Sequence, residues 1–134
     1  MPIEPGLTHE MQHIVQTSDT AASSGGDTLP PVLSTPRMIG LMEGTAHRSL
    51  LPLLGPDQTS VGTVVNIRHL AATPVGMQIR FTSELLSIDG RRLTFKVEAW
   101  DEVEKIGAGE HERFIIDPTR FNRRLAEKQT LVKK

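Results

Sequence analysis

The first residues that could do chemistry are His9, Glu10 and His13, which form the pattern H-E-x-x-H near the start of the chain. In zinc proteases this pattern lies on a helix, where residues four apart share a face and two imidazoles bind one metal. Here Pro5-Gly6 precedes the segment and the polar stretch 17–27 follows it, which favours a short strand. On a strand the two imidazoles would be about 13 Å apart, too far to share a zinc ion. We therefore predict no metal site and interpret the histidines as surface residues of an edge strand.

Length and composition bound the remaining possibilities. The chain has 134 residues, 37% of them hydrophobic, and a formal net charge of -1. These values are typical of one soluble globular domain over residues 1–134 and give no reason to expect nucleic-acid binding. The sequence contains no cysteine, which excludes a disulfide scaffold, a thiolate zinc site and a cysteine nucleophile. Since no segment approaches the roughly 20 apolar residues of a membrane span, we expect a cytoplasmic protein with no membrane partner.

One helix and several strands account for the rest of the chain. Thr35-Pro36 offers an N-cap with proline at the first helical position, and apolar residues then recur at three- and four-residue steps to about Leu54. Beyond this helix the period changes to two, which predicts strands over 61–70, 76–86, 92–100 and 105–116, followed by a charged helix over 118–129. Together with the first strand, this order predicts an α+β fold: an antiparallel sheet of about five strands with one long helix packed on it.

The predicted sheet also indicates self-association. One helix cannot cover both faces of five strands, and an open sheet has two edges with unpaired backbone groups. Pairing of such edges between two copies would satisfy those groups. We therefore expect a homodimer.

Three separated motifs carry a family resemblance: VLSTPRMIGLME over residues 32–43, SVGTVVNIRHLAATPVGM over 60–77 and VEAWDEVEKIGAGEHERFIID over 97–117. In this order they resemble the hotdog-fold acyl-CoA thioesterases, and more specifically the fluoroacetyl-CoA thioesterase-like family, over roughly residues 7–120. The resemblance implies a hotdog fold, with the sheet wrapped around the central helix, and active sites at the interface of a homodimer. It implies hydrolysis of a small acyl-CoA thioester to the free acid and coenzyme A.

The resemblance also implies a catalytic set. The family uses a threonine just before the central helix, a glutamate within it and a histidine on the following strand, which are Thr35, Glu43 and His69 in this sequence. It places the backbone of Gly62, in the S-V-G-T motif, near the acyl group. The fluoroacetyl-specific enzyme closes its pocket with a phenylalanine ahead of the helix, whereas this chain has no Phe, Tyr or Trp before Phe81. The resemblance thus implies thioester hydrolysis without implying fluoroacetyl selectivity.

The three residue types suit this chemistry by themselves. Glu43 lies at the margin of the apolar helix face, where a carboxylate is costly unless it has a partner or a catalytic role. His69 can act as a general base near neutral pH. The alternatives are an exposed helix glutamate, a hydrogen-bonded core histidine and a Thr35 hydroxyl that only caps the helix. The helix start would stabilise the oxyanion, and both water attack and an acyl-enzyme route stay open. Because the α-carbons of Thr35 and Glu43 would be about 12 Å apart, the groups must meet through a folded-back loop, the substrate or two subunits.

Coenzyme A would be part of the substrate, and we predict no bound cofactor. Its phosphates need cations, and Arg113 and Arg120 are the predicted binding residues, with a solvated basic helix face over 120–128 as the alternative. We expect Phe95 and Trp100 to fill the core rather than to stack on adenine.

Other functions stay open. One is a non-catalytic acyl-CoA-binding hotdog module, and another is a hotdog hydratase or dehydratase that acts on an enoyl or hydroxyacyl thioester. Release of free thiol from an acyl-CoA ester separates a thioesterase from both. A zinc protease remains as the last alternative.

Overall fold

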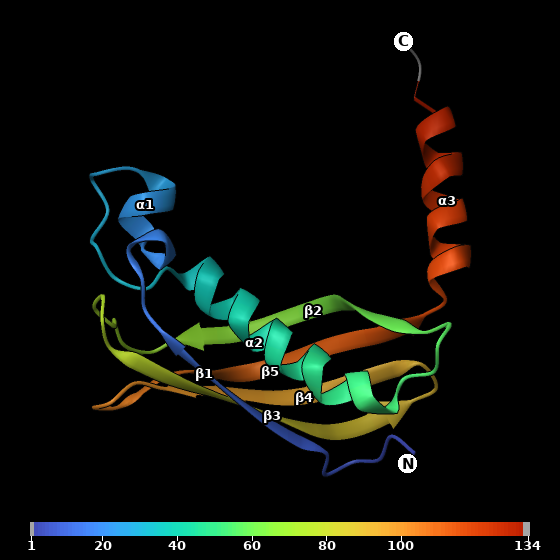
Figure 1. Cartoon of the computed structure of the whole chain (residues 1–134), viewed down its shortest axis with the longest axis horizontal. Coiled ribbons are helices and arrows are strands. Elements are labelled where there is room, and N and C mark those ends of the chain that lie inside the picture. Colours follow the sequence, from blue (N-terminus) through green and yellow to red (C-terminus); the bar gives the residue numbers. More distant parts are fainter. Residues whose placement is uncertain (1, 133–134) are drawn as a thin grey trace.

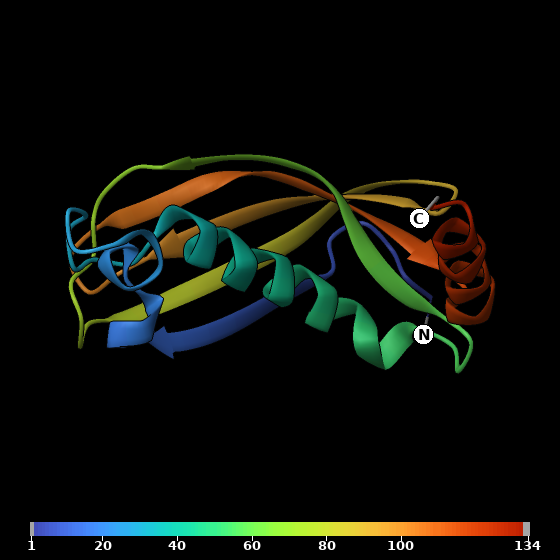
Figure 2. The same cartoon turned by 90° about the horizontal axis from the view of Figure 1, so that it is seen from above.

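A computed structural model describes residues 2–132 and consists of a five-stranded antiparallel sheet with one long helix on one face (Figure 1). The elements are β1 (Thr8–Ile14), α1 (Ala21–Gly25), α2 (Thr35–Leu50), β2 (Thr59–His69), β3 (Gln78–Asp89), β4 (Arg92–Trp100), β5 (Lys105–Ile116) and α3 (Pro118–Thr130). The strand order β1-β3-β4-β5-β2 makes β1 and β2 the sheet edges. The strands curve around α2 (Figure 2), which confirms the predicted α+β architecture.

Alternation along the strands gives the sheet one apolar face. In β4, and in β3 as far as Leu85, every second residue is buried, and the apolar side chains among them belong to the core that includes α2. The core includes Ile79, Phe81, Leu85, Leu93, Phe95, Val97 and Ala99 from the sheet and Met38, Met42, Ala46 and Leu50 from the helix. Full burial of one such large side chain contributes about 1.5 to 3 kcal/mol, so this interface holds α2 in place.

Trp100 does not belong to this core. Phe95 is fully buried as expected, but Trp100 is five positions further along β4, an odd step that places it on the opposite face of the strand. There the Arg80 guanidinium carbon lies 4.5 Å from the centroid of the indole ring, and Lys105 Nζ lies 5.4 Å from it. The prediction of a core tryptophan was therefore wrong because it ignored the period of two.

Both ends of α2 differ from the prediction. Ser34, not Thr35, is the N-cap, and its hydroxyl accepts a hydrogen bond from Arg37 N–H at 3.1 Å. Thr35 is the first helical residue, so its hydroxyl is available for another partner. The α-helix ends at Leu50 and continues as a 3₁₀ turn over Leu51–Leu53, because Pro52 cannot donate to the α-helical ladder.

The segment between β1 and α2 is fixed by Asp19, which is 5% exposed. Its carboxylate accepts hydrogen bonds from the Gln16 N–H at 2.8 Å and from Arg37 Nε at 2.8 Å, and it lies 2.7 Å from His13 Nε2. These contacts join the 3₁₀ turn Thr17–Asp19 to β1 and to the first turn of α2. A segment with little periodic signal is thereby held beside the start of the central helix.

The C-terminal helix α3 projects away from the sheet (Figure 1) and has no buried residue. Asp117 caps it by accepting a hydrogen bond from Thr119 N–H at 2.9 Å. Between residues 2 and 132 no helix has the length and apolar character needed to span a bilayer.

Candidate active site

Thr35 and His69 form a hydrogen-bonded pair at the N-terminal end of α2. Thr35 Oγ1 lies 2.7 Å from His69 Nδ1, although the two residues are 34 positions apart. Burial lowers the pKa of His69 below its usual 6.5, against an opposing contact with the Ala71 backbone. A neutral imidazole can accept the threonine proton, so the pair has the arrangement of a nucleophile and its general base.

No carboxylate among residues 2–132 forms a hydrogen bond with the other ring nitrogen of His69. His69 Nε2 is buried and has no hydrogen-bond partner among residues 2–132. In hydrolases that pair a hydroxyl with an imidazole, a third group usually orients the ring. Within this chain the arrangement is therefore incomplete.

A hollow of about 440 Å³ opens beside the pair. Its lining combines three polar residues with aliphatic side chains and contains no Phe, Tyr or Trp: Ala21, Pro30, Val32, Leu33, Ser34, Thr35, His69, Leu70, Ala71 and Ala72. These residues come from the segment between β1 and α2, from the first residue of α2, from the last residue of β2 and from the chain just after β2. The hollow suits an aliphatic group next to a reactive hydroxyl.

The helix start supplies fewer N–H groups to an oxyanion than the sequence suggests. Arg37 N–H donates to the Ser34 hydroxyl, Met38 N–H donates to the Ser34 carbonyl, and Pro36 has no N–H. The Thr35 N–H and the helix dipole are what this end of α2 offers to a negative charge.

Glu43 lies in a second group of residues two turns further along α2. Its Oε1 is 4.0 Å from His111 Nε2 and 4.0 Å from Arg113 Nη1, both on β5. A β-carbon added to Gly62 would lie only 2.7 Å from the same oxygen. Gly62 is thus the residue that lets the carboxylate lie against strand β2.

Arg113 is buried in this second group and is 8% exposed. It donates from Nε to Ser60 Oγ at 2.7 Å, from Nη2 to the Ser60 carbonyl at 2.9 Å and from Nη1 to His111 Nε2 at 3.1 Å. Burial lowers the pKa of Arg113, and the nearby Glu43 opposes that shift. Burial also lowers the pKa of His111, which is consistent with a neutral ring that accepts from the guanidinium.

The two groups are far apart within one chain. Thr35 and Glu43 are eight residues apart on α2, or about 12 Å along the helix axis. His69 and Gly62 are seven residues apart on β2, or about 23 Å along the strand. The structure therefore brings Thr35 to His69 and Glu43 to Gly62, but it does not bring the two pairs together.

Comparison with known proteins identifies the family. A model of the fluoroacetyl-CoA-specific thioesterase family (FlK) matches residues 15–119. The chain belongs to this family. It is also similar to the fluoroacetyl-CoA thioesterase of Streptantibioticus cattleyicolor, with 43% identity over 99 residues that cover 74% of this chain and 71% of that protein. The predictions of an acyl-CoA thioesterase and of a thioester hydrolase are thereby confirmed.

Solved structures of FlK thioesterases have the same fold. A solved structure of the fluoroacetyl-CoA thioesterase FlK gives a TM-score of 0.91 at 34% identity, over 96% of this chain and 98% of that one. A phenylalanine-to-alanine variant of that enzyme in complex with fluoroacetate and CoA gives 0.84 at 35% identity, over 89% and 99% of the two chains. A thioesterase superfamily member from Thermus thermophilus gives 0.87 at 28% identity, over 98% of each chain. The predicted hotdog fold is confirmed.

The two arginines predicted to bind phosphates are in different environments. Arg113 is 8% exposed, and its Nη1 lies 4.0 Å from Glu43 Oε1. Arg120 is exposed on α3 and lines a hollow of about 260 Å³ together with Arg91 and Phe121. Arg120 is the more exposed of the two side chains, and phosphate binding by either residue stays a prediction.

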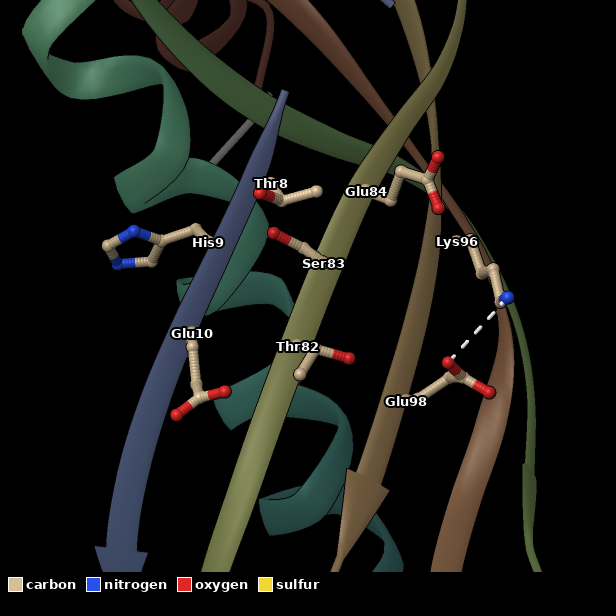
Figure 3. Close-up of a pocket in the computed structure, with 8 residues that line it drawn as sticks. All are labelled: Thr8, His9, Glu10, Thr82, Ser83, Glu84, Lys96 and Glu98. Atoms are coloured by element: carbon tan, nitrogen blue, oxygen red, sulfur yellow. Dashed lines mark ion pairs between the residues drawn. The ribbon is translucent and has the colours of Figure 1, made fainter. Parts of the chain in front are cut away.

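The H-E-x-x-H segment lies on strand β1, as predicted. His13 contacts Asp19. His9 and Glu10 line a hollow of about 420 Å³ formed by residues of β1, β3 and β4 (Figure 3). That hollow is lined by Thr8, His9, Glu10, Thr82, Ser83, Glu84, Lys96 and Glu98, and Lys96 pairs with Glu98. Among residues 2–132 no group of three His, Asp or Glu side chains is arranged to hold a metal ion.

The sequence analysis missed three members of the second group: His47, Ser60 and His111. His47 is one turn beyond Glu43 on α2, and this spacing is a signal that could have indicated a shared face. Nothing local in the sequence connects Ser60 on β2 with Arg113 on β5, because the register of the two strands decides that contact.

Proposed function

We propose that this chain hydrolyses small aliphatic acyl-CoA thioesters in a site that two subunits complete. The observation that carries the proposal is the 2.7 Å contact between Thr35 Oγ1 and His69 Nδ1 beside an apolar hollow. The thioester carbonyl would lie at the start of α2, near the Thr35 N–H. The acyl group would occupy the hollow, whose lining has no Phe, Tyr or Trp to select a fluoroacetyl group.

Strand β2 provides the route to a dimer. It is a sheet edge of 11 residues, and its side chains Val64 and Val65 are 48% and 45% exposed. Antiparallel pairing with β2 of a second copy would satisfy the open backbone groups and cover these apolar side chains. We propose this homodimer as the active form.

The same pairing would complete the active site. In an antiparallel pair centred between Val65 and Asn66, His69 of one subunit lies opposite Gly62 of the partner subunit. Glu43 contacts Gly62 within each chain, so the partner's Glu43 would approach the Thr35 and His69 pair. A dimer would then hold two equivalent sites, each with Thr35 and His69 from one subunit and Glu43 and Gly62 from the other.

Each residue then has a role in hydrolysis. His69 would accept a proton from the Thr35 hydroxyl or from a water molecule in its place, and Glu43 would orient the attacking group or the imidazole. Arg113 would add positive charge near the acyl end of the substrate, and Arg120 would meet the phosphates of coenzyme A. Both routes, through an acyl-enzyme and by direct water attack, fit this arrangement. No further cofactor takes part in the proposal, and the cytoplasm remains the expected location.

The test is release of free coenzyme A from acetyl-, fluoroacetyl-, butyryl- and longer or branched acyl-CoA esters by the purified protein and its Glu43→Ala variant. The proposal expects turnover of aliphatic esters by the wild type, no preference for fluoroacetyl-CoA, and loss of turnover in the variant. Binding of the esters without release of thiol would instead indicate an acyl-CoA-binding module.

A further inference from the structure

A chain of hydrogen bonds from α2 through β2 to β5 links Arg113, beside Glu43, to two residues that have no role in the proposed site, Ser60 and His47. Ser60 Oγ lies 2.6 Å from His47 Nδ1 and 2.7 Å from Arg113 Nε. Ser60 is 5% exposed and Arg113 is 8% exposed. Buried polar groups are costly unless every one is bonded, so an arrangement in which each finds a partner is structurally specific.

The donors and acceptors in this chain fix one another. A guanidinium can only donate, so Ser60 Oγ accepts a hydrogen bond from Arg113 Nε. The Ser60 hydroxyl then donates its own hydrogen bond to His47 Nδ1. At the other side of the guanidinium, His111 Nε2 accepts from Arg113 Nη1, which leaves His111 Nδ1–H to donate to the Val64 carbonyl at 2.8 Å. The orientation of the guanidinium plane is therefore determined from both sides.

Glu43 itself is held only loosely. Both of its charged or polar neighbours on β5 lie 4.0 Å from Oε1, beyond hydrogen-bond distance, and its side chain is 36% exposed. The carboxylate thus has no direct hydrogen bond to a described residue, and the position of the Arg113 charge decides where it points.

We propose that Ser60 and His47 are positioning residues that hold the Arg113 guanidinium beside Glu43 and so set the direction of the Glu43 carboxylate. The inference rests on the proposed catalytic role of Glu43. Ser60 supplies both a hydroxyl and a carbonyl to the guanidinium, and His47 fixes the hydroxyl proton. A displacement of about 1 Å in a catalytic group can lower a rate by up to about a hundredfold, so the effect should be visible in turnover.

The first variant is Ser60→Ala, which removes the bridge between His47 and Arg113. We expect kcat to fall by about tenfold or more while KM changes by less than about twofold, because the acyl hollow beside Thr35 is untouched. Ser60→Thr keeps the hydroxyl and should retain most of kcat. Ser49→Ala is the matched control, since Ser49 is also 5% exposed and donates to the Ala46 carbonyl at 2.6 Å, outside this chain of bonds.

His47 gives a second pair of variants in case Ser60→Ala does not fold. His47→Asn keeps an oxygen acceptor close to the position of Nδ1 and should retain activity, whereas His47→Ala should lower kcat as Ser60→Ala does. Thermal unfolding of each variant shows whether the folded fraction, rather than the site, has changed.

A double-mutant cycle with Glu43→Gln separates positioning from a merely structural role. If Ser60 acts through Glu43, Ser60→Ala lowers kcat in the wild type but has little further effect in the Glu43→Gln enzyme. Wild-type kcat in Ser60→Ala and His47→Ala, or equal effects in both backgrounds, would overturn the inference while leaving the thioesterase proposal intact. Unchanged kcat in Glu43→Gln would overturn the proposed role of Glu43 and this inference together.

Discussion

The two halves of the site are built in opposite ways. Thr35 and His69 lie at the ends of their elements, at the first residue of α2 and the last residue of β2, and meet through a direct 2.7 Å contact. Glu43 and Gly62 lie within α2 and β2, and a buried group from β5 supports them. Within one chain the first half lacks a carboxylate, and the second half holds the Glu43 carboxylate about 12 Å along the helix from Thr35. This difference is the reason for proposing that two subunits complete each site.

The strongest test of either half is removal of its reactive group. Glu43→Ala and His69→Ala should each lower turnover by about a hundredfold or more, because each removes a proposed acid–base or nucleophilic group. Steady-state CoA release measures this. Turnover like that of the wild type in both variants would contradict the catalytic roles proposed for Glu43 and His69.

The Gly62→Ala substitution perturbs the second half of the site and leaves every proposed reactive side chain in the protein. The new β-carbon would lie 2.7 Å from Glu43 Oε1 and 3.2 Å from His111 Cε1, so the flexible carboxylate must move. We expect kcat to fall by about tenfold with little change in thermal stability. Gly44→Ala is the control, because a β-carbon there meets nothing within 4 Å, and its unfolding free energy should rise by about 0.5 to 1 kcal/mol. Equal kcat in Gly62→Ala and the wild type would show that Glu43 does not need its place against β2.

Asp19→Asn tests the support of the first half. Burial raises the pKa of Asp19, but hydrogen bonds from Gln16 N–H, His13 and Arg37 outweigh it and hold the pKa below 3.8. A lowered folded-state pKa stabilises the protein above the ordinary pKa, and this contribution is lost as the pH falls through the folded value. The variant should lose about 1 to 2 kcal/mol of unfolding free energy at pH 7, and the difference should shrink below pH 3.8. A difference that stays constant with pH would contradict this account.

The pKa of His69 should differ between an isolated chain and a dimer in which the partner's Glu43 approaches the imidazole. Burial within the chain lowers it below 6.5, whereas a carboxylate from the partner subunit would raise it again. NMR titration should therefore give a higher His69 pKa in the wild type than in Glu43→Gln, with the variant below 6.5. Identical values would place Glu43 outside the reach of His69.

Local patterns predicted most of the fold. The strands Arg92–Trp100 and Lys105–Ile116 have the predicted bounds, because regular alternation and clear turns mark both. The α1 helix was missed, since five residues rich in Ser and Gly carry no periodic signal. The cap at Ser34 was misplaced by one residue because Ser34 and Thr35 are both good N-caps.

The site was predictable to a smaller extent. Thr35, Glu43 and His69 were predicted from the family resemblance, and the structure adds the residues that each of them contacts. Contacts such as Ser60 with Arg113 depend on the pairing of β2 with β5 and on the irregularity between Gly62 and Val64, which no local pattern encodes. The prediction that Arg113 binds a phosphate did not foresee that its guanidinium is buried 4.0 Å from the Glu43 carboxylate.

Subunit complementation tests the two-subunit site most directly. Equal amounts of the Glu43→Ala and His69→Ala proteins would be unfolded, mixed and refolded together, and CoA release would be compared with that of each variant treated alone. If each site takes Glu43 from one subunit and His69 from the other, every mixed dimer has one intact site, and about a quarter of wild-type activity should return. If both residues of a site belong to the same chain, no intact site forms and the mixture should stay as inactive as its components.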